Sequence, residues 1–232
     1  MVARLGPSIG RAAAALGFDL TDPVREALGD WLDRLKEWNA RIDLTAARTD
    51  DELVDLMVAD ALVLARRIPR DARVVDVGTG AGAPGLALAI LRSDLRVTLV
   101  EPLAKRTSFL RTVVGVLNRP DVTIERGRGE ALAGRRAWDV ALSRATLAPP
   151  AWLELGMTLA APGGVVWVLL AKDGAPTHPR ATLEDDTAYK WPLTGAERRA
   201  VSYVWSRERD VQRGSTTRPT KRTAPEVRSS MR

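Results

Sequence analysis

Asp-Val-Gly-Thr-Gly-Ala-Gly-Ala-Pro-Gly, residues 76–85, is the stretch that decides how this chain folds. A short β-branched run, Val74–Val77, leads into it, and the apolar segment Pro84–Leu91 follows with the pattern of a helix. Glycines between a strand and a helix allow the backbone to pass close to a ligand, because no Cβ stands in the way. The stretch therefore predicts a strand–loop–helix unit of an α/β domain, with a ligand-binding loop.

The spacing of the glycines narrows the class of ligand. A dinucleotide-binding loop reads Gly-x-Gly-x-x-Gly, and here Ala83 takes the place of the third glycine. No Gly-Lys-Ser/Thr follows, so the pattern is not that of an ATP-binding P-loop. Gly78 and Gly80, preceded by Asp76, suit a zwitterionic amino-acid group, whose ammonium the carboxylate attracts and whose carboxylate the loop amides meet. The alternative is a generic tight turn.

A second acidic residue supports a nucleoside ligand. Glu101 closes the next strand, about 25 residues after Asp76. An acid at this point of a βαβ unit is placed to accept hydrogen bonds from the two hydroxyls of an adenosine ribose. The alternative is a surface glutamate, but the loop and the acid together favour a nucleoside cofactor.

Strands and helices alternate outward from this loop. We expect strands at Val74–Val77, Arg96–Val100, Val122–Glu125, Trp138–Ser143, Val165–Ala171 and Ala200–Trp205, and helices at Pro84–Leu91, Lys105–Leu117 and Pro150–Ala160. This alternation predicts a parallel sheet with helices on both faces. Residues 172–187, rich in Pro, Asp and Thr, are expected to form a loop, and the final strand to lie antiparallel at the edge of the sheet.

The N-terminal part has the pattern of two helices. Asp22-Pro23 indicates a cap followed by proline at the first helical position, and apolar residues then recur at steps of four and three as far as Trp38. Residues 49–52 read as the capping box of a second helix. We expect a helical cap over residues 1–70, a ligand-binding core over 71–206 and a basic tail over 207–232.

Composition and charge limit the remaining classes. With 232 residues, 45% of them hydrophobic, the chain suits one globular domain. It has no cysteine, which excludes disulfides, thiolate metal sites and a cysteine nucleophile. We expect no membrane span, no metal and a cytoplasmic location. Of the net charge of +6, residues 207–232 carry +5, either as a solvated disordered terminus or as a segment that binds RNA phosphates.

Several further pieces make the sequence resemble one family, the glucose-inhibited division protein B type, whose members are small-subunit rRNA guanine-N7 methyltransferases. The resemblance runs from about Trp31 to Trp205. Its pieces are Trp38-Asn39, Leu44-Thr45, Asp76–Gly85, Leu99-Val100-Glu101, Lys105-Arg106, Phe109-Leu110-Arg111, Arg128-Gly129-Glu130, Ser143-Arg144-Ala145 and Glu197-Arg198. Many methyltransferases share the glycine loop. Its combination with Pro84, Lys105-Arg106 and Ser143-Arg144-Ala145 is more specific to this family.

The resemblance implies a class I (Rossmann-like) methyltransferase fold with a mostly parallel seven-stranded sheet. It implies S-adenosylmethionine as cofactor and small-subunit ribosomal RNA as partner. The sequence does not give the oligomeric state, for which we favour a monomer. Gly78 and Ala83 should line the methionine end of the cofactor, Gly129 and Glu130 should flank its adenine, and Arg144 should lie beside it at the end of the fourth strand. With Gly80 and Glu101, these are the expected cofactor-binding residues.

The chain also departs from the family pattern. In the second N-terminal helix, members usually carry Arg-His before Asp-Ser, where this chain has Leu56-Met57 and Asp60-Ala61. An asparagine expected before Leu44 is Asp43. The cofactor half of the pattern is kept and the half expected to face the substrate is altered.

The residues also limit the chemistry. Methylation of pyrimidine C5 normally needs a cysteine, which this chain lacks. Methylation of an exocyclic amine uses an Asp/Asn-Pro-Pro-aromatic turn after the fourth strand, whose polar side chain accepts from the amine. The corresponding residues here, Ala148–Ala151, have no such acceptor. Guanine N7 already has a lone pair, so its methylation needs no base and rests on proximity and orientation, with Arg144 as the positioning candidate. His178 is not needed as a base. A small-molecule methyltransferase of the same fold and a non-catalytic RNA-binding relative remain the alternatives.

Overall fold

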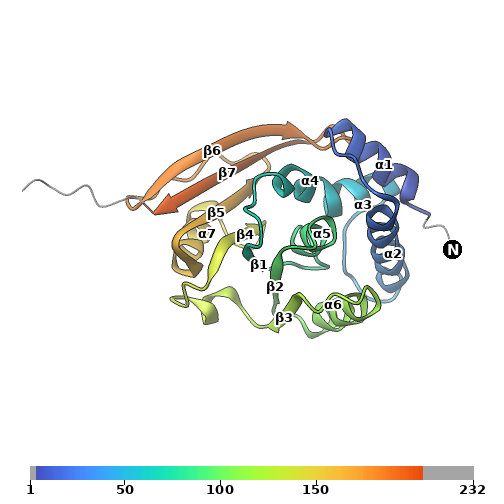
Figure 1. Ribbon diagram of the computed structural model, residues 1–232, viewed down its shortest axis with the longest axis horizontal. Helices are drawn as coiled ribbons and strands as arrows, with labels where there is room; N and C mark the ends of the chain where they lie inside the picture. The colour runs from blue at the N-terminus through green and yellow to red at the C-terminus, as the bar shows by residue number, and fades with distance from the viewer. Residues whose placement is uncertain (1–3, 206–232) are drawn as a thin grey trace, which may run out of the picture.

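Seven strands form one sheet in the order β3-β2-β1-β4-β5-β7-β6 in the computed structural model, which describes residues 4–205 (Figure 1). The strands are β1 (Arg73–Val77), β2 (Arg96–Glu101), β3 (Val122–Arg126), β4 (Trp138–Arg144), β5 (Ala160–Leu170), β6 (Ala181–Lys190) and β7 (Glu197–Trp205). The first five run parallel, whereas β7 is antiparallel to both β5 and β6. The expected mostly parallel, seven-stranded α/β fold is confirmed.

Alternate residues of the strands face two separate hydrophobic clusters. Val74 packs with α5 (Gly85–Leu91) and α6 (Ala104–Val116) on one face of the sheet. Its neighbour Val75 packs on the other face with α7 (Pro149–Leu159) and the short 3₁₀-helix η2 (Gly129–Leu132). Successive side chains of a strand point to opposite faces, so a continuous apolar run is the pattern of a sheet covered on both sides.

The N-terminal helices extend the larger of the two clusters. They are α1 (Gly6–Ala15), α2 (Asp22–Asn39), α3 (Asp50–Val54), the π-helical turn η1 (Asp55–Ala59) and α4 (Asp60–Ala65). Helices α2 and α4 pack against α5 (Figure 1), and Trp31 and Leu35 are fully buried there. The expected boundary between cap and core, at residue 70, falls between α4 and β1, and apolar side chains from both sides of it share one cluster.

Two expectations about the C-terminal part of the described chain are wrong, and one N-terminal helix was not expected. Residues 181–187, expected in a loop, belong to β6, whose side chains are mostly exposed. Because β6 takes the edge, β7 lies inside the sheet and is not its edge strand. Helix α1 was not predicted, since it buries only Ile9 and two alanines and has no strong apolar stripe. The expected tail, residues 207–232, lies outside the described residues.

Smaller differences concern the helix starts. Thr21 is the N-cap of α2, so Asp22 is the first helical residue and not the cap. The predicted capping box forms in part: Thr49 Oγ1 accepts from the Glu52 amide, whereas the Glu52 carboxylate accepts from the amide of Arg48 and not from that of Thr49. The helix that follows is interrupted by η1, a π-helical turn of a kind that often marks functional sites. Within residues 4–205, no helix combines the length and the apolar character needed to cross a bilayer.

Candidate functional site

The glycine loop turns at the carboxyl end of β1. Gly78 and Gly80 have φ angles of +71° and +62°, a region that L-residues rarely adopt. The Gly78 amide donates to the Val100 carbonyl at 2.8 Å, which ties the loop to β2. A Cβ at Gly80 would meet no atom within 4 Å, so the backbone there borders open space. Glycine adopts these angles without strain, so the loop forms a tight turn that is accessible to a ligand.

Asp76 lies under this loop as a fully buried carboxylate. Its Oδ2 accepts from the Thr79 hydroxyl at 2.6 Å and from the Gly85 amide at 2.8 Å. Gly85 has to be glycine, because a Cβ there would lie 2.7 Å from the Asp76 side chain. The second oxygen, Oδ1, is buried and has no hydrogen-bond partner. Burial raises the pKa of Asp76 to about 6, against the opposing effect of the hydrogen bonds from Thr79 and Gly85.

The raised pKa of Asp76 predicts a pH-dependent cost of folding. The folded state binds this proton more tightly than the unfolded chain, so stability is lost as the pH rises from about 4 through 6. We expect Asp76→Asn, which keeps the acceptor for Thr79 and Gly85, to raise the unfolding free energy at pH 7.5 by about 1 to 3 kcal/mol. Urea unfolding at pH 4.5 and 7.5 measures this. If the unfolding free energies of Asp76→Asn and wild type differ by the same amount at both pH values, the predicted cost of the Asp76 charge is contradicted.

Glu101 lies beside the loop at the end of β2. Its side chain is only 2% exposed, and its two oxygens accept from the Gly80 amide at 3.0 Å and the Leu103 amide at 2.9 Å. Arg106 Nη1 lies 3.9 Å from Oε2. The carboxylate therefore joins the first and second loops at this edge of the sheet. Each oxygen of Glu101 keeps a further lone pair that is available to a ribose hydroxyl. The hydrogen bonds from the ribose hydroxyls of the cofactor to Glu101 remain a prediction.

A cavity of about 220 Å³, here called the glycine-loop cavity, opens next to these residues. Gly78, Gly129 and Glu130 line it together with Thr146 and Leu147. A Cβ at Gly129 would lie 2.4 Å from Val77 Cγ1, so this position also requires glycine. The structure thus brings three of the expected cofactor residues to one cavity.

Ala83 is placed differently. It is 5% exposed and packs into the larger hydrophobic cluster, away from the residues that line the glycine-loop cavity. The preceding part of the loop is held by α2, because Trp31 Nε1 donates to the Ala81 carbonyl at 3.2 Å. Asn39, one of the residues that carry the resemblance, accepts from the Leu44 and Thr45 amides and so fixes the chain after α2. These residues support the site and do not line it.

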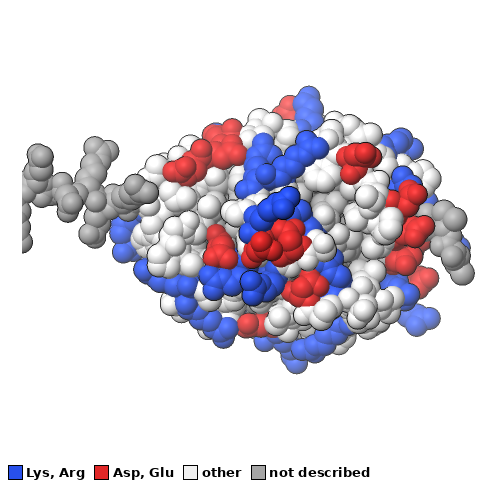
Figure 2. Space-filling view, in the orientation of Figure 1, with Lys and Arg blue, Asp and Glu red and all other residues white. Residues whose placement is uncertain are grey.

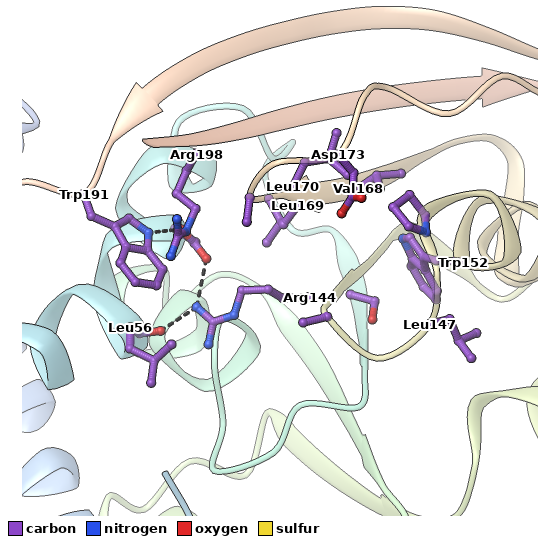
Figure 3. A pocket seen from close by; sticks show the side chains of 15 residues that line it. Leu56, Arg144, Leu147, Trp152, Val168, Leu169, Leu170, Asp173, Trp191 and Arg198 are labelled. Carbon is purple, nitrogen blue, oxygen red and sulfur yellow. Dashed lines mark hydrogen bonds and ion pairs between the residues drawn. The ribbon is translucent and has the colours of Figure 1, made fainter. Parts of the chain in front are cut away.

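Arg144 ends β4 at the same edge of the sheet and is held by a buried carboxylate. Its Nη1 donates to Asp60 Oδ2 at 2.8 Å and to the Leu56 carbonyl in the π-helical turn (Figure 3). Asp60 is 2% exposed, and its Oδ1 accepts from Tyr189 Oη at 2.8 Å and Trp191 Nε1 at 2.7 Å. The Asp60 carboxylate therefore joins η1–α4, β4 and the tip of the β6–β7 hairpin.

Two further contacts reinforce this junction. Asp55, one π-turn before Asp60, is fully buried and accepts from the Leu193 and Thr194 amides and from the Thr194 hydroxyl. Burial and the neighbouring Asp60 carboxylate raise the pKa of Tyr189, so its hydroxyl stays protonated and donating. The hairpin tip is thereby fixed over the π-helical turn.

The residues that depart from the family pattern occupy different environments. Leu56 lines a second cavity, whereas Met57 and Ala61 are 3% and 0% exposed and face the core. Ala145, directly after Arg144, has a φ of +54°, an uncommon conformation for alanine that clusters at functional sites. Of the altered positions in this helix, only Leu56 is placed to contact a ligand.

The second cavity, also about 220 Å³, lies between the ends of β4 and β5 and is here called the β4–β5 cavity (Figure 3). Its lining includes Leu56, Asp60, Arg144, Trp152, Leu169, Leu170, Asp173, Trp191 and Arg198. Leu147 lines both cavities, so the two adjoin. Asp60, Asp173 and Trp191 were not singled out as site residues from the sequence, whereas Arg144 and Arg198 each belonged to a piece of the resemblance.

His178 lies outside both cavities. Its Nε2 is 2.7 Å from Glu154 Oε2, and its ring lies edge-on to Trp205. The interpretation that His178 is not the catalytic base agrees with this position. Within residues 4–205, no group of three or more His, Cys, Asp or Glu side chains is arranged to hold a metal ion.

This arrangement defines a class of protein. The sheet is mostly parallel, a glycine loop follows β1, an acid ends β2, and cavities open at the carboxyl ends of the strands. This is the architecture of the class I methyltransferases. The family model described as rRNA small subunit methyltransferase G (GidB) matches residues 24–182. The chain belongs to this family, as its sequence led us to expect.

Individual relatives agree with this assignment. The ribosomal RNA small subunit methyltransferase G of Anaeromyxobacter dehalogenans (strain 2CP-C) is 32% identical over 218 residues, covering 90% of this chain and 100% of that protein. The enzyme of the same name from Burkholderia ambifaria is 31% identical, covering 88% and 98%. That of Nocardioides sp. is 40% identical over 148 residues, covering 64% of this chain and 58% of that protein.

Solved structures support the fold. MtNAS in complex with MTA and tNA superposes with a TM-score of 0.51 at 14% identity, covering 88% of this chain and 71% of that chain. A protein that converts a disulfide bond into a thioacetal group during echinomycin biosynthesis gives a TM-score of 0.51 at 15% identity, covering 63% and 81%.

Proposed function

We propose that this protein transfers the methyl group of S-adenosylmethionine to N7 of a guanine in small-subunit ribosomal RNA. Family membership supports the methyltransferase reaction, the cofactor and the RNA. The atom N7 rests on the family resemblance and on chemistry, because this nitrogen has a free lone pair and loses no proton. The observation that carries the proposal is the pair of adjoining cavities, one beside the glycine loop and one beside Arg144, which share Leu147.

The residues at the glycine loop fit the cofactor. Asp76 Oδ1, buried beneath the loop and without a partner, provides negative charge that suits the ammonium of the methionine group, and the open space at Gly80 lets the cofactor approach the backbone. The amides of Gly78 and Gly80 already donate to the Val100 carbonyl and to Glu101, so the expectation that they meet the carboxylate of the cofactor is wrong. The residues that we assign to the cofactor are Gly78, Gly80, Glu101, Gly129, Glu130 and Arg144. Ala83, whose amide donates to the Thr79 carbonyl, supports the loop. The cofactor supplies an electrophilic methyl group on a positively charged sulfur.

The chain's own contribution to the chemistry is orientation. A guanidinium does not serve as a base, but that of Arg144, fixed by Asp60 and Leu56, orients groups at the junction of the two cavities. Basic side chains, interleaved with acidic ones, gather in the centre of one face (Figure 2), where RNA phosphates would be attracted. A ribosomal substrate also implies a cytoplasmic protein.

The pKa of Asp76 predicts how the cofactor binds. Below pH 6 the carboxyl is increasingly protonated and attracts an ammonium less, whereas the cofactor's amino group stays charged up to about pH 7.5. We expect S-adenosylmethionine affinity to rise about tenfold from pH 5 to pH 7. Calorimetry on wild type and Asp76→Asn tests this. Equal slopes in the two proteins would remove Asp76 from the cofactor site.

One observation favours a second candidate, methylation of a small molecule. Leu56 brings an aliphatic side chain to the β4–β5 cavity where family members usually carry arginine. The two functions are separated by offering labelled S-adenosylmethionine with either undermethylated small ribosomal subunits or an RNA-free metabolite extract. Label in the 16S rRNA supports the proposal, and label only in the extract supports the second candidate. Cofactor binding without transfer to either would indicate a non-catalytic relative.

A further inference from the structure

The β4–β5 cavity has the composition of a site for a mainly apolar ligand with polar edges. Trp152, Leu169 and Leu170 supply apolar lining, and charged side chains stand around them. Concave sites of this kind bind small groups by apolar contact and set their orientation with a few polar contacts. Because Leu147 also lines the glycine-loop cavity, a ligand here would lie next to the methyl donor.

Asp173 lies on one side of this cavity, and Arg144 and Arg198 lie on the other, together with the Asp60 carboxylate that is paired with Arg144 (Figure 3). Asp173 forms no hydrogen bond or ion pair with any other residue between 4 and 205, so both its oxygens are free to accept. Arg144 uses only Nη1 for Asp60 and Leu56, which leaves Nε and Nη2 free to donate to a ligand. Arg198 stacks over Trp191, with its guanidinium carbon 3.6 Å from the ring centre.

This polarity matches the edges of guanine. Guanine presents two neighbouring donors, N1–H and the N2 amine, on its Watson–Crick edge, and two acceptors, O6 and N7, towards the other edge. A carboxylate accepts from both donors, whereas a guanidinium donates to O6. Adenine has an acceptor at N1 and a donor at N6, so it would place a lone pair against the Asp173 carboxylate. Enzymes that modify a base inside folded RNA read it after unstacking it into such a pocket.

We infer that the β4–β5 cavity receives the target base and that Asp173 selects guanine over adenine. This inference rests on the proposed function. Asp173 accepts from N1–H and N2–H, Arg144 donates to O6, and N7 then faces the side of the cavity that Leu147 shares with the glycine-loop cavity. The two donors that Asp173 reads thus lie on the opposite edge of the base from N7, and O6, which Arg144 contacts, lies between them and N7.

Nucleotide binding provides the first test. Full-length protein with S-adenosylhomocysteine is titrated with guanosine or adenosine monophosphate, and tryptophan fluorescence is followed because Trp152 and Trp191 line the cavity. Wild type should prefer the guanosine nucleotide by about ten- to a hundredfold. Asp173→Asn should largely abolish the preference, since an amide offers only one acceptor to the two donors of guanine. Asp19→Asn, an exposed control on the loop before α2, should behave as wild type.

Methyl transfer to undermethylated small subunits provides the second test. We expect Asp173→Asn to lower kcat/KM at least tenfold, with unchanged cofactor affinity and no such effect of Asp19→Asn. If wild type methylates rRNA while Asp173→Asn keeps both its kcat/KM and its nucleotide preference, the inference is overturned and the proposed function stands. If rRNA is not methylated but the guanosine preference depends on Asp173, the base pocket stands and the proposed function fails.

Discussion

Gly78→Ala is expected to weaken S-adenosylmethionine binding at least a hundredfold while the protein still folds. The added Cβ would lie 2.0 Å from Thr146 Oγ1, and a φ of +71° costs an L-residue about 1 to 2 kcal/mol. Thr146 donates to the Val77 carbonyl, so its side chain has to leave a hydrogen bond to make room. Both the methyl group and the displaced threonine then stand in the glycine-loop cavity.

Calorimetry with the cofactor and its demethylated product measures this effect. Gly115→Ala is the matched control, because a Cβ there meets nothing within 4 Å and alanine is favoured inside helix α6. The control should bind as wild type and be slightly more stable. Unchanged affinity in Gly78→Ala would mean that the loop is only a turn.

Arg144→Ala is expected to lower methyl transfer about a hundredfold, since orientation at the junction of the two cavities is lost. It should also destabilise the protein by about 3 to 5 kcal/mol, because Asp60, 2% exposed, loses its cation. Sequence reasoning alone predicted a large effect on activity with an intact fold. The buried ion pair adds the stability cost. Arg144→Lys should not fully rescue activity, because an ammonium lacks the planar fork.

A second substitution separates the two effects. Adding Asp60→Asn to Arg144→Ala removes the unpaired charge while the amide still contacts the hairpin side chains, so we expect stability to recover and activity to stay low. Arg73→Ala is the control, since it breaks an exposed ion pair with Asp139 at the opposite end of β1. Single-turnover methylation at saturating cofactor is the assay. A wild-type rate in Arg144→Ala would show that this arginine has no role in the reaction.

The middle of the chain was predictable because its local signals agree. Val74–Val77 is a buried β-branched run, and the glycines after it adopt the positive φ angles that the loop requires. Strand β6 gave no such signal. As an edge strand it leaves both faces partly exposed, so its residues read as a polar loop, and β7 was consequently placed at the edge.

The site was predictable only where one short segment contains it. Gly78, Gly129 and Glu130 each belong to a local motif at a strand end, and the structure brings them to one cavity. Tyr189 and Trp191, which donate to Asp60, lie 129 and 131 residues further along the chain. Asp60 directly follows the π-helical turn η1, and no pattern in the sequence indicated that turn. Asp173, in a segment read as a loop, joins the second cavity only through the position of β5.

Nucleoside mass spectrometry of 16S rRNA tests the central claim most directly. Ribosomal RNA from cells with and without this protein is digested to nucleosides, and the same RNA is cut into fragments that locate each methyl group. The account predicts that one 7-methylguanosine disappears without the protein and returns when undermethylated subunits are incubated with purified protein and S-adenosylmethionine. An unchanged content of 7-methylguanosine, or loss of a methyl group from another atom or base, would contradict it.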